Sequence, residues 1–150
     1  VDEVFDRPVR KPHVSGESSK LRFQDGTQIH VAQNTTLNQT LIATGFPYYQ
    51  FEKIDAYLGV LSNLMKTTHG LRRMGSAAID LAYTACGRFD AFFEMNLSPW
   101  DIAAGILLVE EAGGIVTDFS GQPNVIFKNQ IVAASKPIYP TFLNELNILV

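Results

Sequence analysis

Residues 98–118 read SPWDIAAGILLVEEAGGIVTD and contain the start and the end of a helix, together with the strand that follows it. Ser98-Pro99 is typical of a helix start, because serine caps free backbone N–H groups and proline has none to leave unpaired. The helix runs through Ile102–Ala112, and Gly113-Gly114 ends it before a strand at Ile115–Asp118. The stretch therefore predicts a helix that packs beside a strand, the repeating unit of a layered α/β fold.

The sequence on both sides continues this alternation of strands and helices. Three further segments have the composition of strands: Leu41–Gly45, Phe89–Phe93 and Gln130–Ala134. Three more have the apolar spacing of helices: Phe51–Met65, Ser76–Cys86 and about Pro140–Leu149. Because strands and helices alternate along the chain, the predicted fold class is α/β.

Two of the predicted helices differ in how much of their surface is apolar. In the first, apolar residues recur at steps of three or four, which predicts one buried stripe made of Phe51, Ile54, Leu58, Leu61, Leu64 and Met65. Ser76–Cys86 is apolar almost all round and is followed by Gly87, so we expect a buried helix with a glycine C-cap. Trp100 is expected to anchor the core rather than to stack on a ligand.

The N-terminal part has a different character. Asp25-Gly26 lies between two short apolar-alternating runs, Leu21–Phe23 and Ile29–Val31, which predicts a β-hairpin. The preceding residues are rich in Pro, Ser, Gly and charges, as loops are. The chain is therefore divided into a lead-in, a hairpin and an α/β domain: residues 1–19, 20–35 and 36–150.

Composition limits the classes of function. The chain has 150 residues, 46% of them hydrophobic, which is enough for one core, and its net charge of −3 offers no basic surface for nucleic acid or anionic lipid. Cys86 is the only cysteine, so no intrachain disulfide can form, and we expect a reducing compartment, the cytosol. Cys86 is expected to behave as a small apolar residue. No apolar run is long enough to cross a membrane.

Gly75-Ser76 comes directly before the apolar helix and is the first candidate binding element. A glycine and a small hydroxyl residue at a helix start leave backbone N–H groups and the positive helix end facing outward, where a phosphate could bind. Taken alone, the pair is explained more simply as a turn and an N-cap.

Glu94 and Asp101 form the second candidate, seven residues apart at a strand end and a helix start. Carboxylates in such positions can reach a metal ion. On spacing alone, however, Asp101 is explained more simply by a capping box with Ser98. The three histidines, His13, His30 and His69, have no metal-ligand spacing, so we assign them surface or core roles.

Taken together, these segments resemble the C-terminal signature of the inositol monophosphatase family. The motifs that carry the resemblance are Leu41–Tyr48, Gly75–Ala78, Phe93-Glu94, Pro99–Gly105, Glu111–Gly114 and Val116–Asp118 with Gly121. It extends over about residues 20–145. It implies the C-terminal α/β portion of a layered αβαβα sandwich, with the hairpin as a remnant of the first sheet.

The resemblance also implies roles for single residues. In this family the aspartate after the tryptophan binds catalytic Mg²⁺, which implies that Asp101 is a catalytic metal ligand. Substrate contacts are implied for Gly75, Ser76, Ala77 and Glu94. The implied reaction is hydrolysis of a phosphate monoester by metal-bound water, with inositol monophosphate as substrate. Fructose 1,6-bisphosphate, a 3′-phosphoadenosine nucleotide and histidinol phosphate stay open as alternatives.

The family's other metal ligands are a glutamate and an Asp-Pro-Ile-Asp-Gly-Thr segment, which lie upstream of the matched portion and do not occur in these residues. Asp25-Gly26-Thr27 only echoes the end of that segment and is rejected as a metal site. We therefore expect the isolated chain to be crippled as a catalyst. We also expect exposed apolar surface that drives self-association or receives a missing N-terminal half. The competing interpretation is a noncatalytic phosphate-binding or interaction module.

Overall fold

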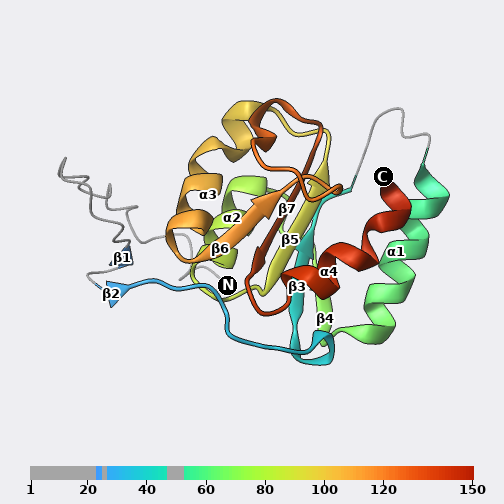
Figure 1. Cartoon of the computed structure of the whole chain (residues 1–150), viewed down its shortest axis with the longest axis horizontal. Helices are drawn as coiled ribbons and strands as arrows, with labels where there is room; N and C mark the ends of the chain where they lie inside the picture. Colours follow the sequence, from blue (N-terminus) through green and yellow to red (C-terminus); the bar gives the residue numbers. More distant parts are fainter. Residues whose placement is uncertain (1–22, 25–26, 47–52) are drawn as a thin grey trace.

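The computed structural model describes residues 23–24, 27–46 and 53–150. Its centre is a mixed sheet of five strands in the order β4-β3-β5-β7-β6 (Figure 1). The strands are β3 (Leu41–Thr44), β4 (Gly70–Arg72), β5 (Ala91–Met95), β6 (Gly114–Thr117) and β7 (Gln130–Ser135). β3 runs parallel to both of its neighbours, β4 and β5, whereas β7 runs antiparallel to β5 and β6.

Helices cover both faces of this sheet. They are α1 (Ile54–Thr67), α2 (Ala77–Ala85), α3 (Pro99–Glu111) and α4 (Tyr139–Glu145), with 3₁₀ turns η2 (Leu37–Gln39), η3 (Val125–Phe127) and η4 (Asn147–Leu149). α2 and α3 pack on one face, and α1 and α4 pack on the other (Figure 1). From β3 the chain passes through α1 to β4, which pairs with one side of β3. It then passes through α2 to β5, which pairs with the other side of β3. Because the two right-handed crossovers run in opposite directions along the sheet, α1 and α2 lie on opposite faces.

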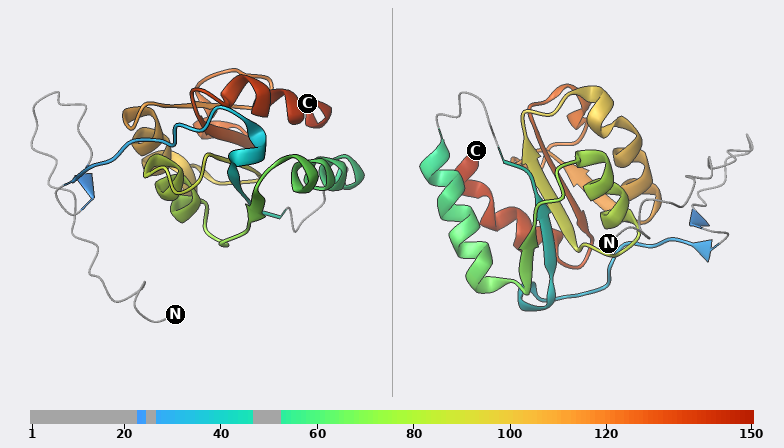
Figure 2. Two further views of the ribbon diagram at one scale, coloured as in Figure 1. Left: turned by 90° about the horizontal axis from the view of Figure 1, so that it is seen from below. Right: turned by 180° about the vertical axis from the view of Figure 1, so that it is seen from behind.

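Strand alternation divides the core into two layers. On β5, Phe92 faces α2 and α3, while Ala91 and Phe93 face α1 and α4, because successive side chains point to opposite faces of a sheet. All three are fully buried. The C-terminal end of the chain lies beside α1 (Figure 2), where Lys53 Nζ donates to the carbonyl oxygens of Leu149 (3.0 Å) and Val150 (2.6 Å).

The predicted α/β fold class is confirmed, and most predicted elements are present with shifted ends. A strand that the sequence did not predict, β4, is only three residues long. β5 begins two residues later than expected, which leaves Phe89 before the strand, and the last helix ends at Glu145. The hairpin forms as two short antiparallel strands, β1 (Phe23–Gln24) and β2 (Thr27–Gln28), apart from the main sheet.

Several predictions concern segments outside the described residues. The lead-in, His13, the hairpin turn at Asp25-Gly26 and Phe51 belong to this group. The division of the chain into a lead-in, a hairpin and a domain stays a prediction. His30 and His69 are exposed, as expected for surface histidines. In the described part of the chain, no helix is long and apolar enough to cross a membrane.

The predicted buried stripe of α1 is wrong at Ile54, Leu58 and Met65, which are 42%, 53% and 63% exposed. Leu64 is buried as predicted, and Leu61 is partly buried. The helix also buries Tyr57 and Val60, which were not predicted. Both stripes have helical spacing, so periodicity could not choose between them. The Tyr57 hydroxyl lies 2.7 Å from Thr44 Oγ1 inside the core, and this contact accounts for the face that turns inward.

The expectation that α2 is buried all round is also wrong. Ala78 and Ile79 face solvent, whereas the polar residues Asp80 and Thr84 are buried. Thr84 satisfies its hydroxyl within the helix by donating to the carbonyl oxygen of Asp80 at 2.8 Å. The helix ends as predicted, with Gly87 in a left-handed conformation at φ +70°.

α2 and α3 approach each other closely at Gly105. A Cβ atom at residue 105 would lie 2.5 Å from Leu81 Cδ1 and 2.6 Å from Leu81 Cβ. Leu81 is fully buried, and its Cβ cannot move without its backbone. The absence of a side chain at residue 105 therefore sets the distance between the two helices.

Gly105→Ala is expected to lower the free energy of unfolding by about 1–3 kcal/mol, because the added methyl overpacks a closed helix contact. Urea denaturation monitored by circular dichroism measures the change. Gly59→Ala is the matched control: a Cβ there meets nothing within 4 Å, so that helical site should tolerate or gain from alanine. Equal stability of Gly105→Ala and wild type would contradict this account of the helix contact.

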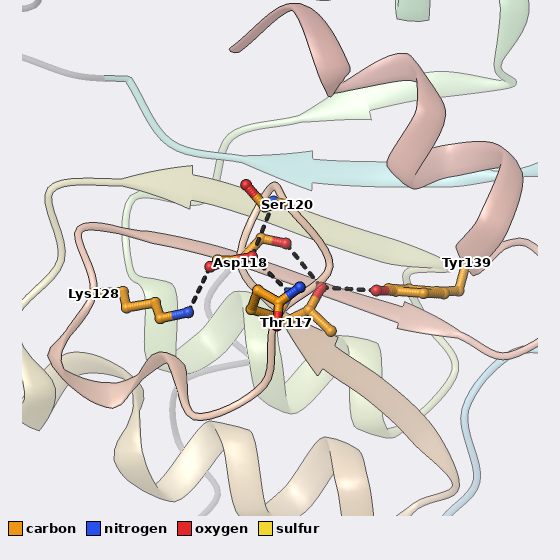
Figure 3. Close-up of polar contacts among 6 residues, drawn as sticks. Thr117, Asp118, Ser120, Lys128 and Tyr139 are labelled. Carbon is orange, nitrogen blue, oxygen red and sulfur yellow. Dashed lines mark hydrogen bonds and ion pairs between the residues drawn. The ribbon is translucent and has the colours of Figure 1, made fainter. Parts of the chain in front are cut away.

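Asp118, directly after β6, organises the loop that leads to η3 (Figure 3). Its Oδ1 accepts hydrogen bonds from the backbone N–H groups of Ser120 (2.9 Å) and Gln122 (2.7 Å), and its Oδ2 pairs with Lys128 Nζ at 2.6 Å. Burial by itself would raise the pKa of Asp118, but these hydrogen bonds outweigh it and hold the pKa below its ordinary value. Beside it, the hydroxyls of Thr117 and Tyr139 lie 2.9 Å apart and tie β6 to α4.

Asp118→Asn is expected to lower the free energy of unfolding at pH 7 by about 1–3 kcal/mol, because it removes the charged acceptor of two backbone N–H groups and of Lys128 Nζ. Since the folded-state pKa lies below the unfolded value of 3.8, the stabilisation is present above that pH. It is lost as the pH falls through the folded-state pKa. Denaturation midpoints of the two proteins should therefore converge in acid, and a constant difference from pH 7 to pH 2 would contradict this origin.

Candidate functional site

The candidate site lies where the three parallel strands end. β3, β4 and β5 finish at Thr44, Arg72 and Met95 on one edge of the sheet. α2 and α3 begin close to the same edge, because each follows one of these strands after a short loop. In open α/β sheets, ligands bind outside the carboxyl ends of the strands, where helix starts and loops surround a crevice.

A cavity of about 320 Å³ opens there. It is lined by residues from the loop before α2, the start of α2, the end of β5 and the start of α3: Arg73, Gly75, Ser76, Ala77, Ala78, Glu94, Leu97, Trp100 and Asp101. The five residues predicted for the site, Gly75, Ser76, Ala77, Glu94 and Asp101, all line it. The structure thus brings together residues that the sequence places up to 26 positions apart.

Glu94 is the partly buried acid of this cavity. Burial, reinforced by the charges of Asp80 and Asp101 and opposed by the charge of Arg73, raises the pKa of Glu94 to about 7. Its carboxyl group lies against Gly45, at the end of β3. At neutral pH the side chain can therefore either accept or donate a hydrogen bond to a ligand hydroxyl.

The start of α2 presents backbone donors. Gly75 has a φ of +90°, which only glycine adopts without strain, and Ser76 follows in an extended conformation at the N-cap position. The Ser76 side chain makes no capping hydrogen bond, so the first N–H groups of this nine-residue helix are not used by its cap. Backbone N–H groups at a helix start, together with the Arg73 side chain in the cavity lining, are groups that can bind an anion, and the predicted phosphate site at Gly75-Ser76 stays a prediction.

Asp101 makes the predicted helix cap and also lines the cavity. Its Oδ2 accepts a hydrogen bond from the Ser98 backbone N–H at 2.9 Å, which is half of the predicted capping box. This bond does not involve Oδ1, and the residue lines the cavity. The cap therefore orients the carboxylate and does not prevent it from binding a ligand.

Comparison with known proteins identifies the family. The model of the inositol monophosphatase family matches residues 4–148. The chain belongs to the inositol monophosphatase family.

The relatives show how much of a family member is present. A putative Nus factor SuhB from Neisseria meningitidis serogroup B is 48% identical over 93% of this chain and 54% of its own length. The crystal structure of extragenic suppressor protein suhB from Bartonella henselae is 42% identical, with a TM-score of 0.77 over 83% of this chain and 47% of its own. The Thermotoga maritima IMPase is 34% identical, with a TM-score of 0.75, and covers 85% of this chain and 48% of its own. The chain spans about half the length of the relatives it matches.

The family's metal chemistry can be tested against the donors present. In the part of the chain that the structure describes, no three His, Cys, Asp or Glu side chains lie close enough to hold a metal ion. Mg²⁺ prefers six oxygen ligands, and one oriented carboxylate supplies few of them. The described residues therefore do not form a magnesium site by themselves, although Asp101 is placed to contribute one ligand.

The prediction for Trp100 is wrong. The side chain is 82% exposed and lines the cavity instead of anchoring the core. It lies in the first turn of α3, whose inner face is formed by Ile102, Gly105 and Val109. Trp100 lies outside that inner face, so its ring does not pack in the core. The ring is exposed at the rim of the cavity and can contact a ligand there.

Asp80 is a polar residue of this region that sequence reasoning missed. It is 1% exposed, and neither carboxyl oxygen has a hydrogen-bond partner among the described residues. Burial raises its pKa to about 6, which the charge of Arg73 opposes. One feature of the sequence could have pointed to it: Asp80 is the single acid within the otherwise apolar run Ala77–Ala82. An unpaired buried charge destabilises the folded state, so Asp80 does not stabilise the fold when it is ionised.

Asp80→Asn is expected to raise the free energy of unfolding at pH 8 by roughly 1–3 kcal/mol, because it removes that charge. The folded-state pKa lies above the unfolded value of 3.8, so wild-type stability is fully present below pH 3.8 and falls as the pH rises through about 6. The difference in the free energy of unfolding between Asp80→Asn and wild type should therefore vanish near pH 4. Denaturation at both pH values tests this, with Asp55→Asn, an exposed acid in the first turn of α1, as the matched control. A loss of stability in Asp80→Asn at pH 8 would contradict it.

Proposed function

We propose that this chain is the substrate-binding half of a Mg²⁺-dependent phosphatase that hydrolyses phosphate monoesters of small polyhydroxylated alcohols, with inositol monophosphate as the leading substrate. The observation that carries the proposal is the convergence of an anion-receptive helix start, a partly buried glutamate and an oriented aspartate on one cavity. Family membership supports the reaction class. We expect the enzyme to act in the cytosol and to self-associate or pair with its upstream half.

Each wall of the cavity suits one part of such a substrate. The N–H groups at the start of α2 and the Arg73 guanidinium are placed to bind phosphate oxygens. Glu94 is placed to bind a hydroxyl group of the alcohol. Asp101 would hold one magnesium ion with ligands from outside the described residues, and bound Mg²⁺ would activate water and stabilise the leaving oxygen.

A second candidate function is a noncatalytic binding module. Two observations favour it: relatives from Pseudomonas aeruginosa and Neisseria meningitidis carry the names Nus factor SuhB and putative Nus factor SuhB, and the described residues lack a complete set of metal ligands. In that case the cavity would bind a phosphate group without turning it over. The two functions differ in whether phosphate is released.

The test is Mg²⁺-dependent phosphate release from inositol 1-phosphate. We expect little turnover by the 150-residue chain and clear turnover when the chain is joined behind the upstream half of the Neisseria relative. In that fusion, Asp101→Asn should lower kcat by roughly a hundredfold, because one metal contact is worth several kcal/mol of charge stabilisation.

Asp55→Asn, far along the chain from the cavity-lining residues, is the control and should leave kcat unchanged. Equal activity of Asp101→Asn and the unsubstituted fusion would refute the role of Asp101. Turnover by the chain alone would refute its dependence on upstream ligands. Phosphate binding without turnover in a folded fusion would favour the noncatalytic module.

A further inference from the structure

The motif Leu41–Tyr48 contains a glycine whose presence the backbone does not explain. Gly45 is not among the residues with positive φ, unlike Gly75, Gly87, Gly113 and Gly121. A side chain at residue 45 would therefore cause no backbone strain. The reason for glycine at this position has to lie in the space around it.

That space is occupied by the carboxyl group of Glu94. A Cβ at residue 45 would lie 1.9 Å from both the Cδ and the Oε1 of Glu94, and 2.4 Å from its Oε2. These distances are far below van der Waals contact. The register explains the meeting, because Thr44 pairs with Phe93 across the parallel strands β3 and β5, which places the next residue of each strand side by side.

The backbone of Gly45 is itself held in place. Its carbonyl oxygen accepts a hydrogen bond from the buried Tyr57 hydroxyl. Tyr57 also lies 2.7 Å from Thr44 Oγ1, and Thr44 Oγ1 lies 2.9 Å from the carbonyl oxygen of Phe93. Burial, opposed by the Thr44 hydrogen bond and reinforced by the charge of Glu94, raises the pKa of Tyr57 to about 12, so the phenol keeps its proton.

We propose that Gly45 is a positioning residue for substrate recognition: the space left by its missing side chain holds the Glu94 carboxyl group at the cavity wall, where it meets a hydroxyl group of the substrate alcohol. This inference rests on the proposed function for the identity of the ligand, but the position of Glu94 can be tested without it. Alanine at residue 45 displaces only the far end of a flexible side chain, so the fold survives and the carboxyl group moves.

The first experiment measures the position of Glu94 directly. In wild type, four charged or titratable groups act on or lie around Glu94: Asp80 on α2, Asp101 on α3, Tyr57 on α1 and Arg73 before α2. ¹³C NMR titration of the Glu94 carboxyl in the chain should give a pKa of about 7. In Gly45→Ala the carboxyl moves toward solvent, and its pKa should fall toward the ordinary value of 4.5.

Gly59→Ala serves as the control, because a Cβ at this site in α1 meets nothing within 4 Å. It should leave the titration of Glu94 unchanged, and both variants should keep the circular dichroism spectrum of wild type. An unchanged Glu94 titration in folded Gly45→Ala would overturn the proposal. This result does not depend on whether the protein is a phosphatase.

The second experiment measures recognition in the fusion with the upstream half. Gly45→Ala should reduce kcat/KM for inositol 1-phosphate by roughly tenfold, mainly through KM, and leave it unchanged for phenyl phosphate, which has no alcohol hydroxyl groups. Glu94→Ala should show the same selectivity, and adding Gly45→Ala to it should cause no further loss. Equal losses on both substrates would overturn the role in hydroxyl recognition. Absence of activity in the unsubstituted fusion would refute the proposed function, while the NMR titration still decides the role of Gly45 in positioning Glu94.

Discussion

The close contact between Leu81 and Gly105 is the constraint on which the rest of the structure depends. It allows α2 and α3 to lie against each other on the same face of the sheet, with less space between them than any side chain at residue 105 would permit. Because both helices start near the carboxyl ends of the parallel strands, this contact also brings their N-terminal ends together. The loop before α2 and the oriented aspartate at the start of α3 therefore line one cavity.

Acids that are unfavourable to bury lie in and near the cavity. The charges of Asp80 and Asp101 act on Glu94, and the pKa values of Asp80 and Glu94 are both raised. A folded protein gains nothing in stability from a buried carboxylate without a partner. Acids with strongly shifted pKa values in a cleft are more typical of functional sites. At such sites the shifted pKa serves the reaction, although the buried acid lowers the stability of the fold. Asp118 is the opposite case, since three donors satisfy its carboxylate and it fixes a loop.

The chain spans about half the length of its relatives, and helices nevertheless cover both faces of its sheet. The two core layers are closed by α1 and α4 on one side and by α2 and α3 on the other. The residues that line the cavity lie on and between these elements, whereas no three His, Cys, Asp or Glu side chains in the described part of the chain lie close enough to hold a metal ion.

By itself, the sequence determined the α/β class and the ends of α3, because capping residues, glycines and helical spacing act over a few neighbouring positions. It also named five residues that the structure places around one cavity, and their roles stay a prediction. It could not choose which apolar stripe of α1 turns inward, since the Tyr57 hydroxyl finds its partner on another strand. It placed Trp100 in the core, because only packing shows that the inner face of α3 is already occupied. The burial of Asp80 and the meeting of Glu94 with Gly45 were decided by tertiary structure alone, because both depend on contacts between segments that are distant in the chain.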